Sequence, residues 1–194
     1  MARVLVPLAS GCEELEAVTI IDLLRRAGVE VVTAGLAPGI VKASRGTQLV
    51  PDTTLDAALL DEYDMVVLPG GMPGAQYLKD DARVIALIQK MGVAGRYVAA
   101  ICAGPMVLAA AGVLSGKTAT GYPGLLEKMN LTDVTLSTEA VVRDGMVITS
   151  RGPGTAMDFA LTLVEILAGH EMRGQVETGL VRALASTKAD IVYH

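Results

Sequence analysis

The chain has 194 residues, 52% of them hydrophobic, with one phenylalanine and no tryptophan. This length suits a single domain over residues 1–194 with an aliphatic core, and it leaves little room for a second full domain. The net charge of −5 and the absence of a run of lysine and arginine argue against a nucleic-acid-binding surface.

Apolar strands alternate with amphipathic helices along the chain. The first half predicts, in order, a strand at 4–8, a helix at 13–27, a strand at 29–34, a strand pair within 39–50 that turns at 44–46, a helix at 55–60, a strand at 65–68 and helices at 74–78 and 82–91. The second half predicts a strand at 97–101, a helix at 106–111, a strand at 117–120, a helix at 125–129, strands at 138–142 and 146–149 with a turn at 144–145, and helices at 154–168 and 172–184. This order is typical of an α/β fold with a doubly wound parallel sheet sandwiched by helices.

The two cysteines, Cys12 and Cys102, are too few for a disulfide framework and suit a reducing compartment. The apolar start is too short for a secretion signal, since Pro7 interrupts it and acidic residues follow at once. No apolar run reaches the length of a membrane span. We therefore expect a cytoplasmic protein that contacts neither membrane nor nucleic acid.

Three predicted strands end in glycine-rich or reactive loops. These loops are Ser10-Gly11-Cys12, Pro69-Gly70-Gly71 and Cys102-Ala103-Gly104. In doubly wound sheets, ligands bind beyond the carboxyl ends of the strands. We therefore expect the three loops to meet at one edge of the sheet.

Cys102 follows the apolar run 97–101 and precedes Gly104, Pro105 and a stretch of helix formers. This is the arrangement of a nucleophile elbow, with cysteine as the nucleophile. The free N–H groups and positive end of the following helix favour a thiolate there. An isolated cysteine after an apolar strand is more often a buried core residue. The Cys-Ala-Gly-Pro context favours the nucleophile.

The first predicted helix opens with three glutamates that differ in position. Ser10 and Glu13 fit a capping box, which makes Glu13 structural. Glu14 lies on a mixed, solvated face. Glu16 shares the apolar stripe of the helix, so burial near Cys102 raises its pKa and equips it to donate a hydrogen bond or shuttle a proton. The alternative for Glu16 is an acidic first turn that stabilises the helix dipole.

Backbone N–H groups near the predicted nucleophile suggest an oxyanion hole. The glycines at 70 and 71 let the backbone approach a ligand, and the N–H groups of Gly71 and Ala103 form the candidate pair. A phosphate loop is the competing interpretation, but the Gly-Lys-Ser/Thr ending is missing. Only His170 and His194 are present, and neither is placed to form the Cys–His pair that a peptidase or glutamine amidotransferase needs.

Three further residues are candidates for the same pocket. Cys12 is compatible with a resolving thiol, with a thin metal set alongside Cys102 and Glu16, or with a spectator thiol. Arg26 and Arg45 are compatible with an anion-binding patch or with ordinary surface ion pairs. The residues supply no convincing metal or cofactor site, and we expect neither.

The stretches GCEELEAV, LLRRAGVEV, VVLPGGMPGAQ, AAICAGP and TSRGPGTAMDFAL together make the chain resemble the ThiJ/PfpI superfamily over nearly its whole length. The branch is that of the Parkinson-associated protein deglycase and the bacterial chaperone YajL, within the class I glutamine amidotransferase-like domains. The resemblance implies a flavodoxin-like sandwich, a homodimer and an easily oxidised cysteine. It assigns that cysteine to Cys102, and the protonated carboxylate to Glu16. By the same resemblance, Gly71 and Ala103 supply the N–H pair, and Arg26 and Arg45 lie near the cysteine.

Two positions depart from the family pattern. Ala103 stands where protease-like relatives have histidine, which speaks against peptidase activity. Tyr122 stands where the deglycase often carries histidine, and tyrosine is a poor base near neutrality. This substitution moves the proton transfer to Glu16.

These features lead to one main hypothesis and two rivals. The main hypothesis is a cofactor-independent glyoxalase or protein deglycase that acts on methylglyoxal, glyoxal or their protein adducts through Cys102. The first rival is a redox-sensing, oxidation-dependent chaperone with little turnover. The second is a hydratase of small electrophiles that uses the same nucleophile.

Overall fold

The structure, a computed structural model, describes residues 1–182. Its centre is a seven-stranded sheet in the order β10-β11-β7-β6-β1-β2-β5. The strands are β1 (Arg3–Leu8), β2 (Glu30–Gly35), β5 (Thr53–Thr54), β6 (Met65–Leu68), β7 (Tyr97–Ile101), β10 (Val141–Asp144) and β11 (Val147–Ser150). All neighbouring strands are parallel except the β10–β11 hairpin. The predicted doubly wound α/β fold is confirmed.

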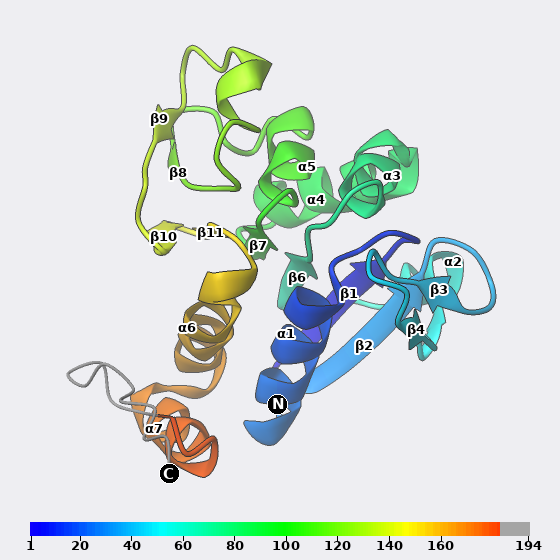
Figure 1. The fold of residues 1–194 in the computed structure, drawn as a ribbon, viewed down its shortest axis with the longest axis vertical. Coiled ribbons are helices and arrows are strands. Elements are labelled where there is room, and N and C mark those ends of the chain that lie inside the picture. The colour runs from blue at the N-terminus through cyan, green and yellow to red at the C-terminus, as the bar shows by residue number, and fades with distance from the viewer. Residues whose placement is uncertain (183–194) are drawn as a thin grey trace, which may run out of the picture.

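Helices cover both faces of this sheet (Figure 1). On one side lie α1 (Glu14–Arg26), α6 (Ala156–Ala168) and α7 (His170–Gly179); on the other lie α3 (Gly74–Asp80), α4 (Ala82–Val93) and α5 (Pro105–Ala110), while the short α2 (Leu55–Ala58) follows β5. Successive strand residues point to opposite faces, so β7 contributes Ala99 and Ile101 to one core and Val98 and Ala100 to the other. A strand buried on both faces therefore appears in the sequence as a continuous apolar run.

Smaller elements decorate the carboxyl edge and one end of the sheet. They are the antiparallel pair β3 (Val41–Lys42) and β4 (Gln48–Leu49), the parallel pair β8 (Thr118–Ala119) and β9 (Thr135–Leu136), and the 3-10 turns η1 (Glu127–Met129) and η2 (Pro153–Thr155). The turn at 44–46 is confirmed, since the N–H of Ala43 donates to the carbonyl of Thr47 at 2.8 Å. The two-residue strands β5 and β9 are too short to leave a pattern in the sequence.

Three predicted elements differ from the structure. The helix expected at 125–129 is a single 3-10 turn that ends at Asn130, whose φ is +51°. The strand expected at 138–142 is shifted to Val141–Asp144, because Asp144 pairs with Val147 and its carboxylate accepts the N–H of Thr118 at 2.9 Å. The last helix begins at His170, and the end predicted for it at 184 lies outside the described residues. Among residues 1–182, no helix has the length and apolar character needed to cross a bilayer.

The strand order reverses direction at β1. From β1 the chain passes through α1 to β2 on one side, and β6 pairs with the other side of β1 and leads to α3 on the opposite face. The loops after β1 and β6 therefore diverge, which opens the crevice where doubly wound folds bind ligands. The loop after β7 borders the same crevice.

Phe159 tests the packing of the core between the sheet, α1 and α6. It is fully buried and is the only phenylalanine. We expect Phe159→Ala to lower the free energy of unfolding by about 3–5 kcal/mol, because the cavity left behind adds to the lost apolar burial. Urea denaturation measures the loss. Tyr77→Ala, at a half-exposed aromatic residue on α3, is the control and costs less than about 1 kcal/mol. Equal losses at the two positions would contradict this packing.

Candidate active site

Cys102 sits in a strained turn between β7 and α5. Its φ is +62°, which only a few per cent of non-glycine residues adopt. Its N–H donates to the carbonyl of Ser150 at 2.9 Å, and its carbonyl accepts the N–H of Tyr122 at 2.8 Å. The residue is 8% exposed and lies beside the loop that follows β6. The predicted strand-to-helix position is confirmed, and the strain is that of an elbow that presents a side chain to the sheet edge.

Gly70 lets the nucleophile, the carboxylate and an N–H donor converge. A Cβ at Gly70 would lie 2.7 Å from the Cβ of Cys102, 2.7 Å from the nitrogen of Ala103 and 2.8 Å from Oε2 of Glu16. Real side-chain contacts are never this short, so only glycine fits at this position. The residue that follows, Gly71, has a φ of +87° and directs its N–H toward the sulfur of Cys102.

Glu16 lies on the buried side of α1, with no exposed surface. Its Oε2 accepts the N–H of Gly70 at 2.7 Å, and the carboxyl group lies beside the side chain of Cys102. Its Oε1 has no further polar partner in the described part of the chain. Burial raises the pKa of Glu16 to about 7, against the lowering effect of the hydrogen bonds from Cys102 and Gly70.

Glu16 and Cys102 hold their protons jointly. Burial, followed by the charge and hydrogen bond of Glu16, raises the pKa of Cys102 to about 12, although the N–H groups of Gly71 and Ala103 oppose this rise. The sequence-based expectation is that the N-terminal end of the helix after Cys102 favours a thiolate. Because the pKa of Cys102 is raised, the N-terminus of the six-residue α5 does not by itself produce one. Because two anions in contact away from water repel each other strongly, the pair keeps one proton above about pH 7. Moving that proton to Glu16 leaves the charge on sulfur.

A hollow of about 440 Å³ opens over this pair. Its lining consists of Glu13, Ser44, Arg45, Gly71, Met72, Cys102, Ala103, Tyr122, Leu125 and Pro153. The structure thus brings together Cys102, Gly71, Ala103, Tyr122 and Arg45, as the sequence predicts, with Glu16 and Gly70 in contact below. The lining residues that the prediction did not include are Glu13, Ser44, Met72, Leu125 and Pro153. Pro153 follows β11 at the same edge, so the rule on carboxyl ends of strands could have found it.

The rim of the hollow shows that the predicted capping box is wrong. Glu13 precedes α1 without a side-chain cap, and its carboxylate accepts the hydroxyl of Ser44 at 2.8 Å. Glu14 is not simply solvated, since it accepts the backbone N–H groups of Arg45 at 3.0 Å and Thr47 at 3.3 Å. Although burial alone would raise it, these bonds and those from its own N–H and Ser44 lower the pKa of Glu14 to about 2.

Two other candidates do not line the hollow. Cys12 is fully buried, and burial, followed by the charge of Glu14, raises the pKa of its thiol to about 11. Arg26 lies in the last turn of α1, paired with Asp22 at 2.8 Å. The helical rise separates Arg26 from the start of α1 by about 18 Å, so it cannot reach Cys102 of its own chain. Within residues 1–182, no three His, Cys, Asp or Glu side chains gather as a metal-binding group.

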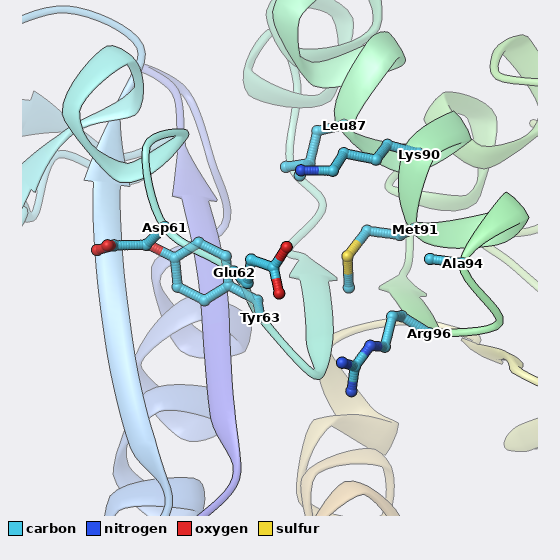
Figure 2. Close-up of a pocket in the computed structure, with 8 residues that line it drawn as sticks. All are labelled: Asp61, Glu62, Tyr63, Leu87, Lys90, Met91, Ala94 and Arg96. Atoms are coloured by element: carbon cyan, nitrogen blue, oxygen red, sulfur yellow. The ribbon is translucent and has the colours of Figure 1, made fainter.

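A second hollow, of about 220 Å³, lies at the opposite edge of the sheet, where β6 and β7 begin (Figure 2). Asp61, Glu62, Tyr63, Leu87, Lys90, Met91, Ala94 and Arg96 line it. Asp61 is paired with Arg3 at 3.0 Å, and Arg96 with Asp64 at 2.7 Å. This hollow contains no thiol or hydroxyl nucleophile other than the phenol of Tyr63, which donates to a carbonyl. The chemistry therefore favours the hollow over Cys102.

The family model for the DJ-1/PfpI family matches residues 2–166. The chain belongs to the DJ-1/PfpI family. Among its relatives, protein dj-1beta of Drosophila melanogaster is 46% identical over 180 residues, which cover 92% of this chain and 96% of that protein. The crystal structure of Drosophila melanogaster DJ-1beta superposes with a TM-score of 0.89 at 45% identity and covers 94% of this chain and 99% of that one. The flavodoxin-like fold and the DJ-1 branch of the ThiJ/PfpI superfamily are thus confirmed.

One relative in this family carries an activity in its name. The glutathione-independent glyoxalase DJR-1.2 of Caenorhabditis elegans is 36% identical over 170 residues, which cover 88% of this chain and 90% of that protein. The family therefore includes a glyoxalase, and this relative supports an enzymatic role for the arrangement around Cys102.

Glu16→Gln tests the protonation of the buried pair. The pKa of Glu16 is raised from 4.5 in the unfolded chain to about 7 in the folded protein, so wild type loses stability as the pH rises through this range. Glutamine keeps the shape without the ionisation. We expect the variant to gain stability relative to wild type between pH 4.5 and pH 8, by at most about 3 kcal/mol. Urea denaturation across this range measures the difference, and a difference independent of pH would show that Glu16 is not a buried acid.

Proposed function

We propose that this protein is a cysteine-dependent glyoxalase or protein deglycase that needs no cofactor. The observation that carries the proposal is the contact between Cys102 and Glu16 beneath a hollow supplied with two N–H donors. A nucleophile, a proton carrier and an oxyanion site are what the rearrangement of a dicarbonyl requires. The glyoxalase among the relatives supports this choice of substrate class.

The first step joins the substrate to sulfur. With the shared proton on Glu16, the thiolate of Cys102 adds to the aldehyde carbon of methylglyoxal, and a C–S bond forms as the carbonyl π bond breaks. The N–H groups of Gly71 and Ala103 are available to the developing alkoxide. Glu16 then transfers its proton to this oxygen, which gives a hemithioacetal and leaves a carboxylate.

The second step moves a hydrogen between the two carbons. The carboxylate of Glu16 takes the proton from the former aldehyde carbon and returns it to the former ketone carbon through an enediol, while the hydroxyl proton passes from the first oxygen to the second. The first carbon is oxidised and the second reduced, so no external oxidant is needed. The product is a thioester of lactate on Cys102. Water then cleaves the C–S bond, which releases lactate and regenerates the shared-proton pair. Glyoxal gives glycolate by the same steps.

The dimensions of the hollow allow more than free dicarbonyls. At about 440 Å³ it has room for substrates well beyond a three-carbon molecule, and its rim carries Glu13 and Arg45 with apolar Met72 and Leu125. The hemithioacetal or aminocarbinol adduct of a protein side chain presents the same reactive carbon. We therefore include glycated proteins among the substrates.

Lactate production from methylglyoxal is the direct test. We expect wild type to form lactate without glutathione and Cys102→Ser to fall to background, because the hydroxyl is a far weaker nucleophile. Cys12→Ala is the matched thiol control and keeps its activity, since Cys12 does not line the hollow. Background lactate from wild type would refute the proposal. Turnover of isonitriles in its place would favour a hydratase.

A redox-responsive chaperone is the second candidate, and the orphaned Oε1 of Glu16 favours it. When protonated, the carboxyl group of Glu16 beside Cys102 can donate a hydrogen bond to an oxidised sulfur. Each oxidation step transfers one oxygen from peroxide to Cys102 and releases water, first to sulfenic and then to sulfinic acid. Protection of a client protein from aggregation after oxidation, lost in Cys102→Ser, would support this function.

Peptide masses after graded peroxide treatment test this second candidate. We expect Cys102 to gain oxygen before Cys12, because Cys102 lines the hollow whereas Cys12 has no exposed surface. Glu16→Gln should lower the yield of the sulfinic acid. Prior oxidation of Cys12 would contradict the choice of Cys102 as the reactive thiol, and unchanged yields in the variant would exclude the role assigned to Glu16. The homodimer and the cytoplasmic location stay predictions.

A further inference from the structure

The peptide group between Cys102 and Ala103 has a partner at each end. Its carbonyl, on Cys102, accepts the N–H of Tyr122 at 2.8 Å. Its N–H, on Ala103, lies close to the sulfur of Cys102 and acts to lower the pKa of the thiol. A peptide group is planar and rigid, so fixing the carbonyl also fixes the direction of the N–H. By bonding to the carbonyl of Cys102, the N–H of Tyr122 thus orients the N–H of Ala103 at the other end of the same peptide group.

The segment 120–122 depends on β11 for its own position. The N–H of Thr120 donates to Oγ1 of Thr149 at 2.9 Å, and both residues are almost completely buried. The segment passes close to the elbow, because a Cβ at Gly121 would lie 3.3 Å from the carbonyl oxygen of Cys102. The hydroxyl of Thr149 therefore holds the chain at Thr120, two residues before Tyr122, whose N–H bonds to Cys102.

The same strand also holds the other side of the elbow. Ser150, next to Thr149, accepts the N–H of Cys102 at 2.9 Å. The hydroxyl of Ser150 donates to the carbonyl of Ala140 at 2.8 Å and lies 2.7 Å from the hydroxyl of Thr155. The end of β11 is therefore itself held by hydrogen bonds. Of the two hydrogen bonds that fix the backbone of Cys102, one comes directly from β11 and the other reaches it through Thr149.

We propose that Thr149 is a positioning residue for Cys102: its hydroxyl holds segment 120–122 so that the Tyr122 N–H keeps the Ala103 N–H aimed at the sulfur. For turnover the inference rests on the proposed function, but the reactivity of the thiol tests it independently. Thr149 itself touches neither sulfur nor substrate, since it lies within the sheet and does not line the hollow.

Thr149→Val keeps the shape of the side chain and removes the acceptor. The buried N–H of Thr120 then lacks a partner, and the segment shifts to find one. We expect alkylation of Cys102 by iodoacetamide at pH 7 to slow about tenfold, with its pH profile displaced upward by about one unit. Peptide masses separate Cys102 from Cys12. Methylglyoxal turnover should lose kcat with little change in KM, and Thr149→Ser should restore both readouts.

The other groups that influence this pH profile are unchanged in these variants. They are Glu16 on α1, Glu13 before α1, Arg45 in the β3–β4 turn and the phenol of Tyr122. A shift in the profile therefore reports on the geometry of the N–H donors rather than on a lost charge.

Thr33→Val is the matched control. Thr33 is another buried strand threonine, whose hydroxyl bonds to Asp52 at 2.8 Å and accepts the Asp52 N–H at 2.9 Å, on β2 and away from the hollow. Both variants should lose stability, but only Thr149→Val should slow alkylation of Cys102. A wild-type alkylation profile in Thr149→Val, or equal slowing in Thr33→Val, overturns the proposal.

Gly121→Ala is an independent variant that keeps the proposal testable if Thr149→Val does not fold. The added Cβ presses on the carbonyl oxygen of Cys102 and displaces the same segment. It should slow alkylation in the same direction, and an unchanged rate would count against the proposal. If wild type makes no lactate, the proposed function fails, whereas the alkylation profiles still decide the role of Thr149.

Discussion

The contact between Glu16 and Cys102 at the carboxyl edge of the sheet is the constraint on which the site depends. The carboxyl group comes from the buried stripe of α1 and the thiol from the end of β7, so the contact exists only when β1, β6 and β7 lie side by side. Gly70 adjoins both side chains, and a methyl group at this position would collide with them. The fold therefore supplies an acidic pair that cannot ionise fully.

One turn of helix shows how strongly surroundings determine the behaviour of a carboxylate. Glu14 and Glu16 are two residues apart, yet the pKa of the first is about 2 and that of the second about 7. Glu14 faces the N–H groups of the β3–β4 turn, which stabilise its charge, whereas Glu16 faces the core, which destabilises it. Glu13, between the two environments, accepts a hydroxyl at the rim.

Much of this arrangement is predictable from local patterns in the sequence. Apolar runs located β6 and β7 to the residue, and the glycines after them indicated loops that meet at one edge. Long-range contacts were not predictable. Ser44 displaced the expected partner of Glu13, and the length of α1 removed Arg26 from the pocket. The role of Thr149 could not be predicted from the sequence, because the N–H that its hydroxyl accepts belongs to Thr120, 29 residues away in the chain.

The hydrogen bonds between Glu14 and the β3–β4 turn determine how the site responds to mildly acidic pH. The carboxylate of Glu14, whose pKa is about 2, stays ionised throughout the range in which Glu16 becomes protonated. It therefore keeps its hydrogen bonds with the backbone N–H groups of Arg45 and Thr47. Acidification from pH 7 to pH 5 would therefore protonate both Glu16 and Cys102 and make the thiol unreactive. The β3–β4 turn at the rim of the hollow would keep its conformation over the same range. Reactivity and access are governed by two neighbouring carboxylates that respond to separate ranges of acidity.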